Sequence, residues 1–150
     1  MQCSKKMNKM NENKKTYTLE DFREIIGILR GEYGCPWDKE QTHGSLADCM
    51  TEEAAEAVLG IRHYEETGDA ENMKEELGDV LLQIVMHAQL AEEEGLFTME
   101  DILYEICEKM IRRHPHVFEP DGTPLNGREP DPDNLKSWQE IKALEKQKNA

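Results

Sequence analysis

Acidic residues at helical spacing are the feature of this sequence that is best suited to chemistry. They lie in two segments, residues 52–56 (EEAAE) and residues 75–79 (EELGD). At about 100° per residue, Glu53 and Glu56 stand about 60° apart around a helix, and so do Glu76 and Asp79. Each segment therefore places a pair of carboxylates on one face of a helix.

The elements that carry these acids are predicted to be two helices, over about residues 45–66 and 70–94. Apolar residues recur at helical spacing along both, and the short turn at Gly68 makes them antiparallel neighbours. If their acidic faces meet, four carboxylates share one volume and need a counter-charge, for which Mg²⁺ or Mn²⁺ is suited by its preference for oxygen. The alternative is that both faces are solvated and bind nothing. A di-iron bundle is disfavoured because neither helix carries its Glu-x-x-His motif.

Three further helices complete an all-α prediction, over about residues 19–29, 98–113 and 135–147. Thr18, Ser45 and Thr98 each open a Ser/Thr-x-x-Asp capping signature. No segment alternates with a period of two, so no significant sheet is expected. We predict a single four-helix-bundle-like domain over residues 17–148, with an additional short C-terminal helix, preceded by a disordered basic tail over residues 1–16.

The composition narrows the classes of partner. The chain has 150 residues and a net charge of −14. This charge disfavours binding to nucleic acid or to an anionic membrane, because both attract proteins with a positive field. The four cysteines are scattered, and no apolar run reaches the 18 or so residues of a membrane span. A reducing, cytoplasmic setting is therefore the default expectation.

The acidic pattern is part of a longer series of motifs. Residues 52–56 followed by residues 76–79 resemble the EExxE and ExxD signature of the all-α nucleoside triphosphate pyrophosphohydrolases, and within them the MazG family. The similarity continues in family order through CPWD at 35–38, QTH at 41–43, KMIRRHPHVF at 109–118 and W-x-x-I-K at 138–142. It covers about residues 19–146, which makes it far more specific than EExxE alone.

The resemblance implies a fold, a reaction and a metal. MazG-like domains are helical bundles that form dimers or higher homo-oligomers. With Mg²⁺, or Mn²⁺ as a substitute, they hydrolyse an NTP or dNTP to NMP and pyrophosphate, which suits a house-cleaning role in the nucleotide pool. Carried over by position, the metal ligands are Glu53, Glu56, Glu76 and Asp79. The catalytic carboxylates are Glu52 and Glu53, with Glu52 supporting the metal site or orienting water.

Three cations on the helix over residues 98–113 are the expected phosphate contacts. Lys109 and Arg113 stand at i and i+4, with Arg112 beside them. Arginine suits this role because its paired donors match phosphate oxygens. The alternative is that the three only complement the dipole at the end of their helix.

The remaining candidate substrate contacts lie near the two ends of the matched region. Trp37 and Trp138 either stack on a base or pack in the core. Asp38, Gln41 and His43 either hydrogen-bond to the base or ribose, or only hold the loop around Pro36 in place. A different class of function also stays open: a non-catalytic helical module that binds nucleotide or a basic partner protein through its acidic residues.

Overall fold

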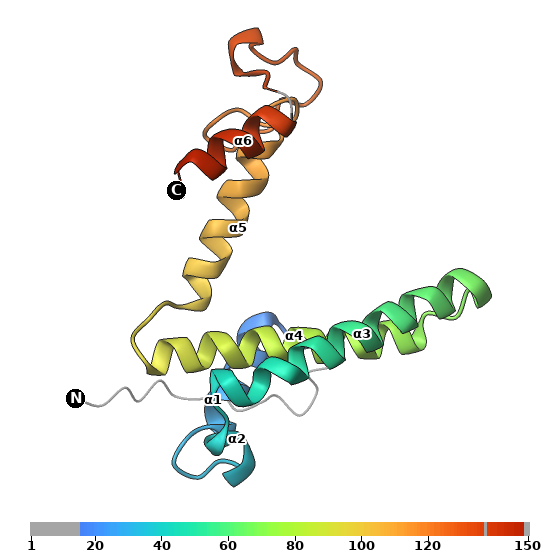
Figure 1. The fold of residues 1–150 in the computed structure, drawn as a ribbon, viewed down its shortest axis with the longest axis vertical. Coiled ribbons are helices and arrows are strands. Elements are labelled where there is room, and N and C mark those ends of the chain that lie inside the picture. Colours follow the sequence, from blue (N-terminus) through green and yellow to red (C-terminus); the bar gives the residue numbers. More distant parts are fainter. Residues whose placement is uncertain (1–15, 137, 149–150) are drawn as a thin grey trace. The chain divides into compact units, whose positions relative to one another are not determined.

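Figure 1 shows the fold in a computed structural model, which describes residues 16–136 and 138–148. The helices are α1 (Leu19–Leu29), α2 (Pro36–Glu40), α3 (His43–Thr67), α4 (Glu71–Glu93), α5 (Met99–Arg113) and α6 (Trp138–Lys148), with a 3-10 helix, η1 (Pro132–Asn134), before the last. These described ranges contain no strand; Phe118 and Pro124 form an isolated bridge. The all-α prediction is confirmed.

The chain divides into two compact units, one up to Leu96 and one from Phe97 onward. The first holds α1 to α4, and the second holds α5 and α6. The single domain expected over residues 17–148 stays a prediction, and the expected basic tail lies outside the described residues except for Thr16. No helix in the described ranges has both the length and the apolar character that crossing a membrane requires.

The main element of the first unit is an antiparallel pair, α3 and α4, which run side by side in Figure 1. Gly68 ends α3 with a φ of 75°, a left-handed conformation that glycine adopts without strain. At Gly60 the two helices approach so closely that a Cβ would lie 3.0 Å from the Cα of Met73. The predicted pairing of these two helices is therefore present, and this close approach sets their register.

The start of α3 differs from the prediction. Ser45 was expected to cap it, but the cap is Thr42, whose hydroxyl accepts a hydrogen bond from the backbone N–H of Ser45 at 3.1 Å. The Ser45 hydroxyl in turn accepts from the backbone N–H of Thr42 at 2.9 Å. This reciprocal capping box starts the helix at His43, one residue after its cap.

The short helix α2 was not predicted at all. It has five residues, which is too few to display an apolar period, and it begins with Pro36, whose fixed φ and missing N–H suit a first helical turn.

The core of the first unit covers only part of the predicted apolar faces. Ile26 of α1, Leu46 of α3 and Val85 of α4 are almost completely buried. Other apolar residues of the two long helices stay exposed, including Val58 and Ile61 on α3 and a stripe of three on α4 at i, i+4 and i+7: Leu77, Leu81 and Ile84. Within the first unit, α3 and α4 thus keep apolar surface that the chain itself does not bury.

The second unit is built around α5 and α6, which contact each other. Thr98 caps α5 through a capping box with Asp101, as its sequence signature predicted. Ile141 of α6 and Leu125 of the connecting segment are buried. The last helix begins at Trp138 rather than near residue 135, because η1 precedes it and Leu135 has an extended conformation.

Candidate functional site

Three of the four predicted metal-ligand residues lie together between α3 and α4. Glu53 of α3 and Glu76 and Asp79 of α4 each offer a carboxylate oxygen, and these oxygens all lie within 4.8 Å of one another. All three residues are partly buried. The antiparallel packing brings them together, since it sets the middle of α3 against the beginning of α4.

The close approach of these acids changes their electrostatics. Burial raises the pKa of the Glu53 carboxyl above its ordinary value, and the charges of Asp79 and Glu56 raise it further. Burial also raises the pKa of Glu76, and Glu56 adds to this through its charge and through a hydrogen bond. Both raised pKa values mean that negative charge is unfavourable in this cluster, so binding of a proton or of a cation there is favoured.

Glu56 and Glu52 stand at the margin of this group. Both are exposed, and neither belongs to the set whose oxygens lie within 4.8 Å. Glu56 nevertheless raises the pKa of Glu76 through its charge and a hydrogen bond, and the charge of Glu52 contributes to the raised pKa of Glu53. The two residues are thus coupled to the partly buried trio while remaining accessible to solvent.

The donor set fits a divalent cation that prefers oxygen. The Oε2 atom of Glu76 is buried and has no hydrogen-bond partner among the described residues. An unpartnered buried carboxylate oxygen is costly, and a metal ion is one group that would satisfy it. All three ligands are carboxylates, which suits Mg²⁺ or Mn²⁺ rather than a metal that prefers sulfur or nitrogen.

Gln83 is a further polar residue that the predicted site did not include. It lies one turn beyond Asp79 on α4, is only 6% exposed, and its Oε1 has no hydrogen-bond partner among the described residues. A glutamine among the apolar residues of a helix is the signal that marks it, since buried polar side chains are normally paired.

The side chain of Gln41, predicted to contact a base or ribose, makes contacts that hold its own loop. Its amide donates to the backbone oxygen of Trp37 at 2.9 Å, and its carbonyl oxygen accepts from the Ser45 hydroxyl at 2.8 Å. Arg30, the C-cap of α1, donates to the backbone oxygens of both Asp38 and Gln41. These contacts favour the loop-holding alternative for Gln41, while Trp37 remains 60% exposed on α2.

His43, the first residue of α3, pairs with His87 of α4. The two Nδ1 atoms are 2.7 Å apart, and the rings stack with centroids separated by 5.0 Å. Because the Nδ1 atoms share one hydrogen bond, one ring donates and the other accepts. Burial lowers the pKa of His87, and the charge of His43 lowers it further.

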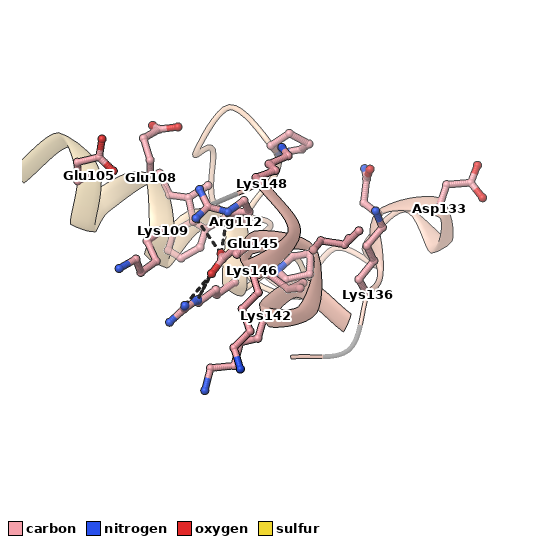
Figure 2. A pocket seen from close by; sticks show the side chains of 18 residues that line it. Glu105, Glu108, Lys109, Arg112, Asp133, Lys136, Lys142, Glu145, Lys146 and Lys148 are labelled. Atoms are coloured by element: carbon pink, nitrogen blue, oxygen red, sulfur yellow. Dashed lines mark hydrogen bonds and ion pairs between the residues drawn. The ribbon is translucent and has the colours of Figure 1, made fainter. Parts of the chain in front are cut away.

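The predicted phosphate contacts line a cavity of about 960 Å³ between α5 and α6 in the second unit. Figure 2 shows Lys109 and Arg112 on its α5 wall, facing Lys142 and Glu145 of α6. Arg113 lines the same cavity. Trp138 begins α6, but its side chain lies outside the described residues.

The predicted site residues are divided between the two compact units of the chain. The acidic trio and the His43–His87 pair belong to the first unit, and the basic residues belong to the second.

Comparison with known proteins decides the family. Residues 41–118, just over half of the chain, match the model of the MazG nucleotide pyrophosphohydrolase domain. The chain belongs to the MazG family. The matched MazG segment contains all the candidate metal ligands, Glu52 and the basic residues of α5, whereas Trp37, Asp38 and Trp138 lie outside it.

Relatives of the MazG domain cover most of this chain. The chain is 48% identical over 130 residues to the nucleoside triphosphate pyrophosphohydrolase/pyrophosphatase MazG of Thermotoga maritima, covering 85% of this chain and 46% of that protein. It is 47% identical over 130 residues to the uncharacterized protein YabN of Bacillus subtilis, covering 87% and 25% respectively. A nucleoside triphosphate pyrophosphohydrolase of Escherichia coli K12 is 42% identical over 119 residues, covering 79% and 42%. The chain therefore spans between a quarter and just under half of these relatives.

Proposed function

We propose that this chain is a Mg²⁺-dependent nucleoside triphosphate pyrophosphohydrolase that converts an NTP or dNTP to NMP and pyrophosphate, with Mn²⁺ as a substitute metal. The observation that carries the proposal is the meeting of Glu53, Glu76 and Asp79 within 4.8 Å in a member of the MazG family. A role in cleaning the nucleotide pool, in a cytoplasmic setting, is part of the same proposal.

The proposed metal ligands are the trio together with Glu56, which is coupled to Glu76. A bound Mg²⁺ supplies positive charge that neutralises the triphosphate and lowers the pKa of a coordinated water. The side chains of Glu53, Glu76 and Asp79 would hold that ion on the α3–α4 hairpin. They cannot attract the substrate by themselves, because a triphosphate and a carboxylate cluster repel each other.

The proposed hydrolysis needs an acceptor for a proton. Water attacks the α-phosphorus, the bond from that phosphorus to the bridging oxygen breaks, and pyrophosphate leaves with the bonding electron pair. Glu52 is exposed next to Glu53 and is proposed to orient this water or accept its proton as a general base. On α5, Lys109, Arg112 and Arg113 are proposed to bind the phosphates, where arginine offers paired donors.

The proposed assembly is a homodimer or a higher homo-oligomer. Its support is the apolar surface that α3 and α4 leave exposed, above all the stripe of Leu77, Leu81 and Ile84. Apolar stripes at helical spacing normally pack against another helix, and these three residues keep between 38% and 48% of their surface exposed. The net charge of −14 continues to disfavour nucleic acid and anionic membranes as partners.

The direct test is pyrophosphate release from a panel of NTPs and dNTPs with and without Mg²⁺. We expect release that depends on the metal and that is lost in Glu53→Gln and in Asp79→Asn, with circular dichroism showing unchanged helix content. Nucleotide binding without any release by the wild-type protein would refute the proposal and favour a non-catalytic binding module. Normal turnover in both variants would show that these carboxylates do not form the proposed metal site.

A further inference from the structure

Glu145 of α6 is the point where two of the proposed phosphate-binding arginines meet. Its Oε2 accepts from Nη2 of Arg113 at 2.7 Å and from Nε at 3.2 Å. Its Oε1 accepts from Nε of Arg112 at 2.9 Å and lies 2.8 Å from Nη2 of the same residue. Figure 2 shows these contacts converging on one carboxylate at the wall of the α5–α6 cavity.

This convergence does not follow from the helix that carries the arginines. Consecutive residues of an α-helix point about 100° apart, so the side chains of Arg112 and Arg113 leave α5 in different directions. Two guanidinium groups also repel each other. A shared anionic partner overcomes both effects, and Glu145 supplies it from the neighbouring helix.

The carboxylate of Glu145 is a durable partner. The Glu145 side chain is only 16% exposed and that of Arg113 only 18% exposed. Hydrogen bonds from Arg113, followed by those from Arg112, lower the pKa of Glu145 to about 2, so it remains ionised at any working pH. Charge-assisted, two-point contacts of this kind hold a guanidinium in one orientation.

The cavity still has a surplus of positive charge. Seven cationic residues line it, namely Lys109, Arg112, Arg113, Lys136, Lys142, Lys146 and Lys148, against four acids, namely Glu105, Glu108, Asp133 and Glu145. The single negative charge of Glu145 balances only one of the two positive charges of Arg112 and Arg113, so these three side chains together keep a net positive charge. An anion therefore still finds a favourable site beside the pair.

We propose that Glu145 is a positioning residue for the triphosphate: it draws the guanidinium groups of Arg112 and Arg113 to one place on the cavity wall, so that both contact the same phosphate chain. The inference rests on the proposed function for the identity of the anion. The contacts that motivate it lie wholly within the second unit.

Isothermal titration calorimetry on the full chain, with inorganic tripolyphosphate in metal-free buffer, tests the role of Glu145. This measurement of binding requires neither a metal ion at the acidic trio nor catalysis. We expect Glu145→Gln to weaken binding about tenfold, as for the loss of a well-oriented charge-assisted contact. Glu108→Gln is the matched control, since Glu108 lines the same cavity and has no ion pair among the described residues. Removing its charge should leave binding unchanged or slightly tighter.

Kinetics with the preferred nucleoside triphosphate give a second readout. We expect Glu145→Gln to raise KM about tenfold while kcat changes less than twofold, and Glu145→Asp, which keeps the charge on a shorter side chain, to recover part of the loss. A purely structural role would lower the melting temperature without moving KM. If Glu145→Gln does not fold, the Asp variant carries the test, with an expected KM about threefold above wild type.

The outcomes separate this inference from the proposed function. Equal or tighter tripolyphosphate binding by Glu145→Gln overturns the positioning role, because it would mean that the carboxylate competes with phosphate. A wild-type protein that binds no tripolyphosphate also overturns it, even if the protein hydrolyses nucleotides. A wild-type protein that binds tripolyphosphate, loses that binding in Glu145→Gln and hydrolyses no nucleotide supports the positioning role while refuting the proposed hydrolase.

Discussion

Replacing Glu76 by Gln should stabilise the metal-free protein and abolish its stabilisation by magnesium. In the metal-free protein, the Glu76 carboxylate lies within 4.8 Å of ligand oxygens of Glu53 and Asp79, and its Oε2 has no hydrogen-bond partner among the described residues. Removing its charge relieves repulsion, so the metal-free variant should melt at a higher temperature than metal-free wild type. The same change removes a proposed ligand, so Mg²⁺ should no longer stabilise the protein.

The size of the metal effect follows from mass action. One ion present at 100 times its Kd stabilises the folded state by about 2.7 kcal/mol. For a chain of this size, each kcal/mol corresponds to about 2–4 °C in Tm. Mg²⁺ should therefore raise the Tm of the wild-type protein by about 5–11 °C and that of Glu76→Gln by less than about 1 °C.

The pH dependence of stability provides an independent check on the same carboxylates. The pKa of Glu76 is raised in the folded state above its ordinary value of 4.5, so the folded protein binds more protons than the unfolded chain between these two values. The Glu76 carboxyl should therefore contribute a gain in the stability of metal-free wild type as the pH falls from neutral toward 4.5, and that contribution should be lost as the pH rises through the raised pKa. In Glu76→Gln this gain should be smaller.

Thermal melts followed by circular dichroism, in EDTA and in Mg²⁺, measure each of these effects. Glu75→Gln is the matched control, because it removes one charge from the neighbouring, exposed position of α4. It should keep the full response to Mg²⁺. The reasoning is refuted if metal-free Glu76→Gln is less stable than metal-free wild type, or if both proteins respond equally to Mg²⁺.

Three further predictions concern packing and titration in the first unit. Leu81→Glu, which places a charge in the exposed apolar stripe of α4, should convert an oligomer to monomers in size-exclusion chromatography with light scattering; an unchanged mass would show that this stripe is not the interface. Gly60→Ala should destabilise by about 1–3 kcal/mol in urea unfolding, because its Cβ would lie 3.0 Å from the Cα of Met73, whereas Gly27→Ala, with ordinary contact at 3.8 Å, should gain up to about 1 kcal/mol. His87 has a lowered pKa, so its titration should contribute a loss of stability as the pH falls below 6.5 toward that pKa, opposite in sign to the contribution of Glu76. Acid melts of His87→Gln should lack this contribution, and equal slopes for His87→Gln and wild type would contradict this.

Most helices were predictable because their signals are local. The capping box at Thr98 marks the beginning of α5 through hydrogen bonds within one turn. Gly68 marks the end of α3 through its left-handed backbone conformation. The start of α3 was displaced to Thr42 because two hydroxyl residues three apart competed for the cap, and the reciprocal bond with Ser45 decided between them. The five residues of α2 were missed because so short a helix has no detectable period.

The candidate site was predictable to the level of helix faces. A spacing of three residues places Glu76 and Asp79 on one face whatever the helix packs against, and a short turn at Gly68 makes α3 and α4 neighbours. The spacing could not predict that Glu53 would join the close trio while Glu56 would stay exposed outside it. Glu56 affects the trio by raising the pKa values of Glu53 and Glu76.

The amino-acid sequence by itself determined the helical class, the motif order and the residues that can meet, since periodicity, caps and spacing are properties of short segments. Only the tertiary structure decided which side chains do meet. It paired His43 with His87, left Leu81 of the apolar face exposed, and joined Arg112 and Arg113 through Glu145. The physical reason is that such contacts depend on the register and separation of helices that are far apart in the chain. That register is set by close packing at points such as Gly60, and no local pattern encodes it.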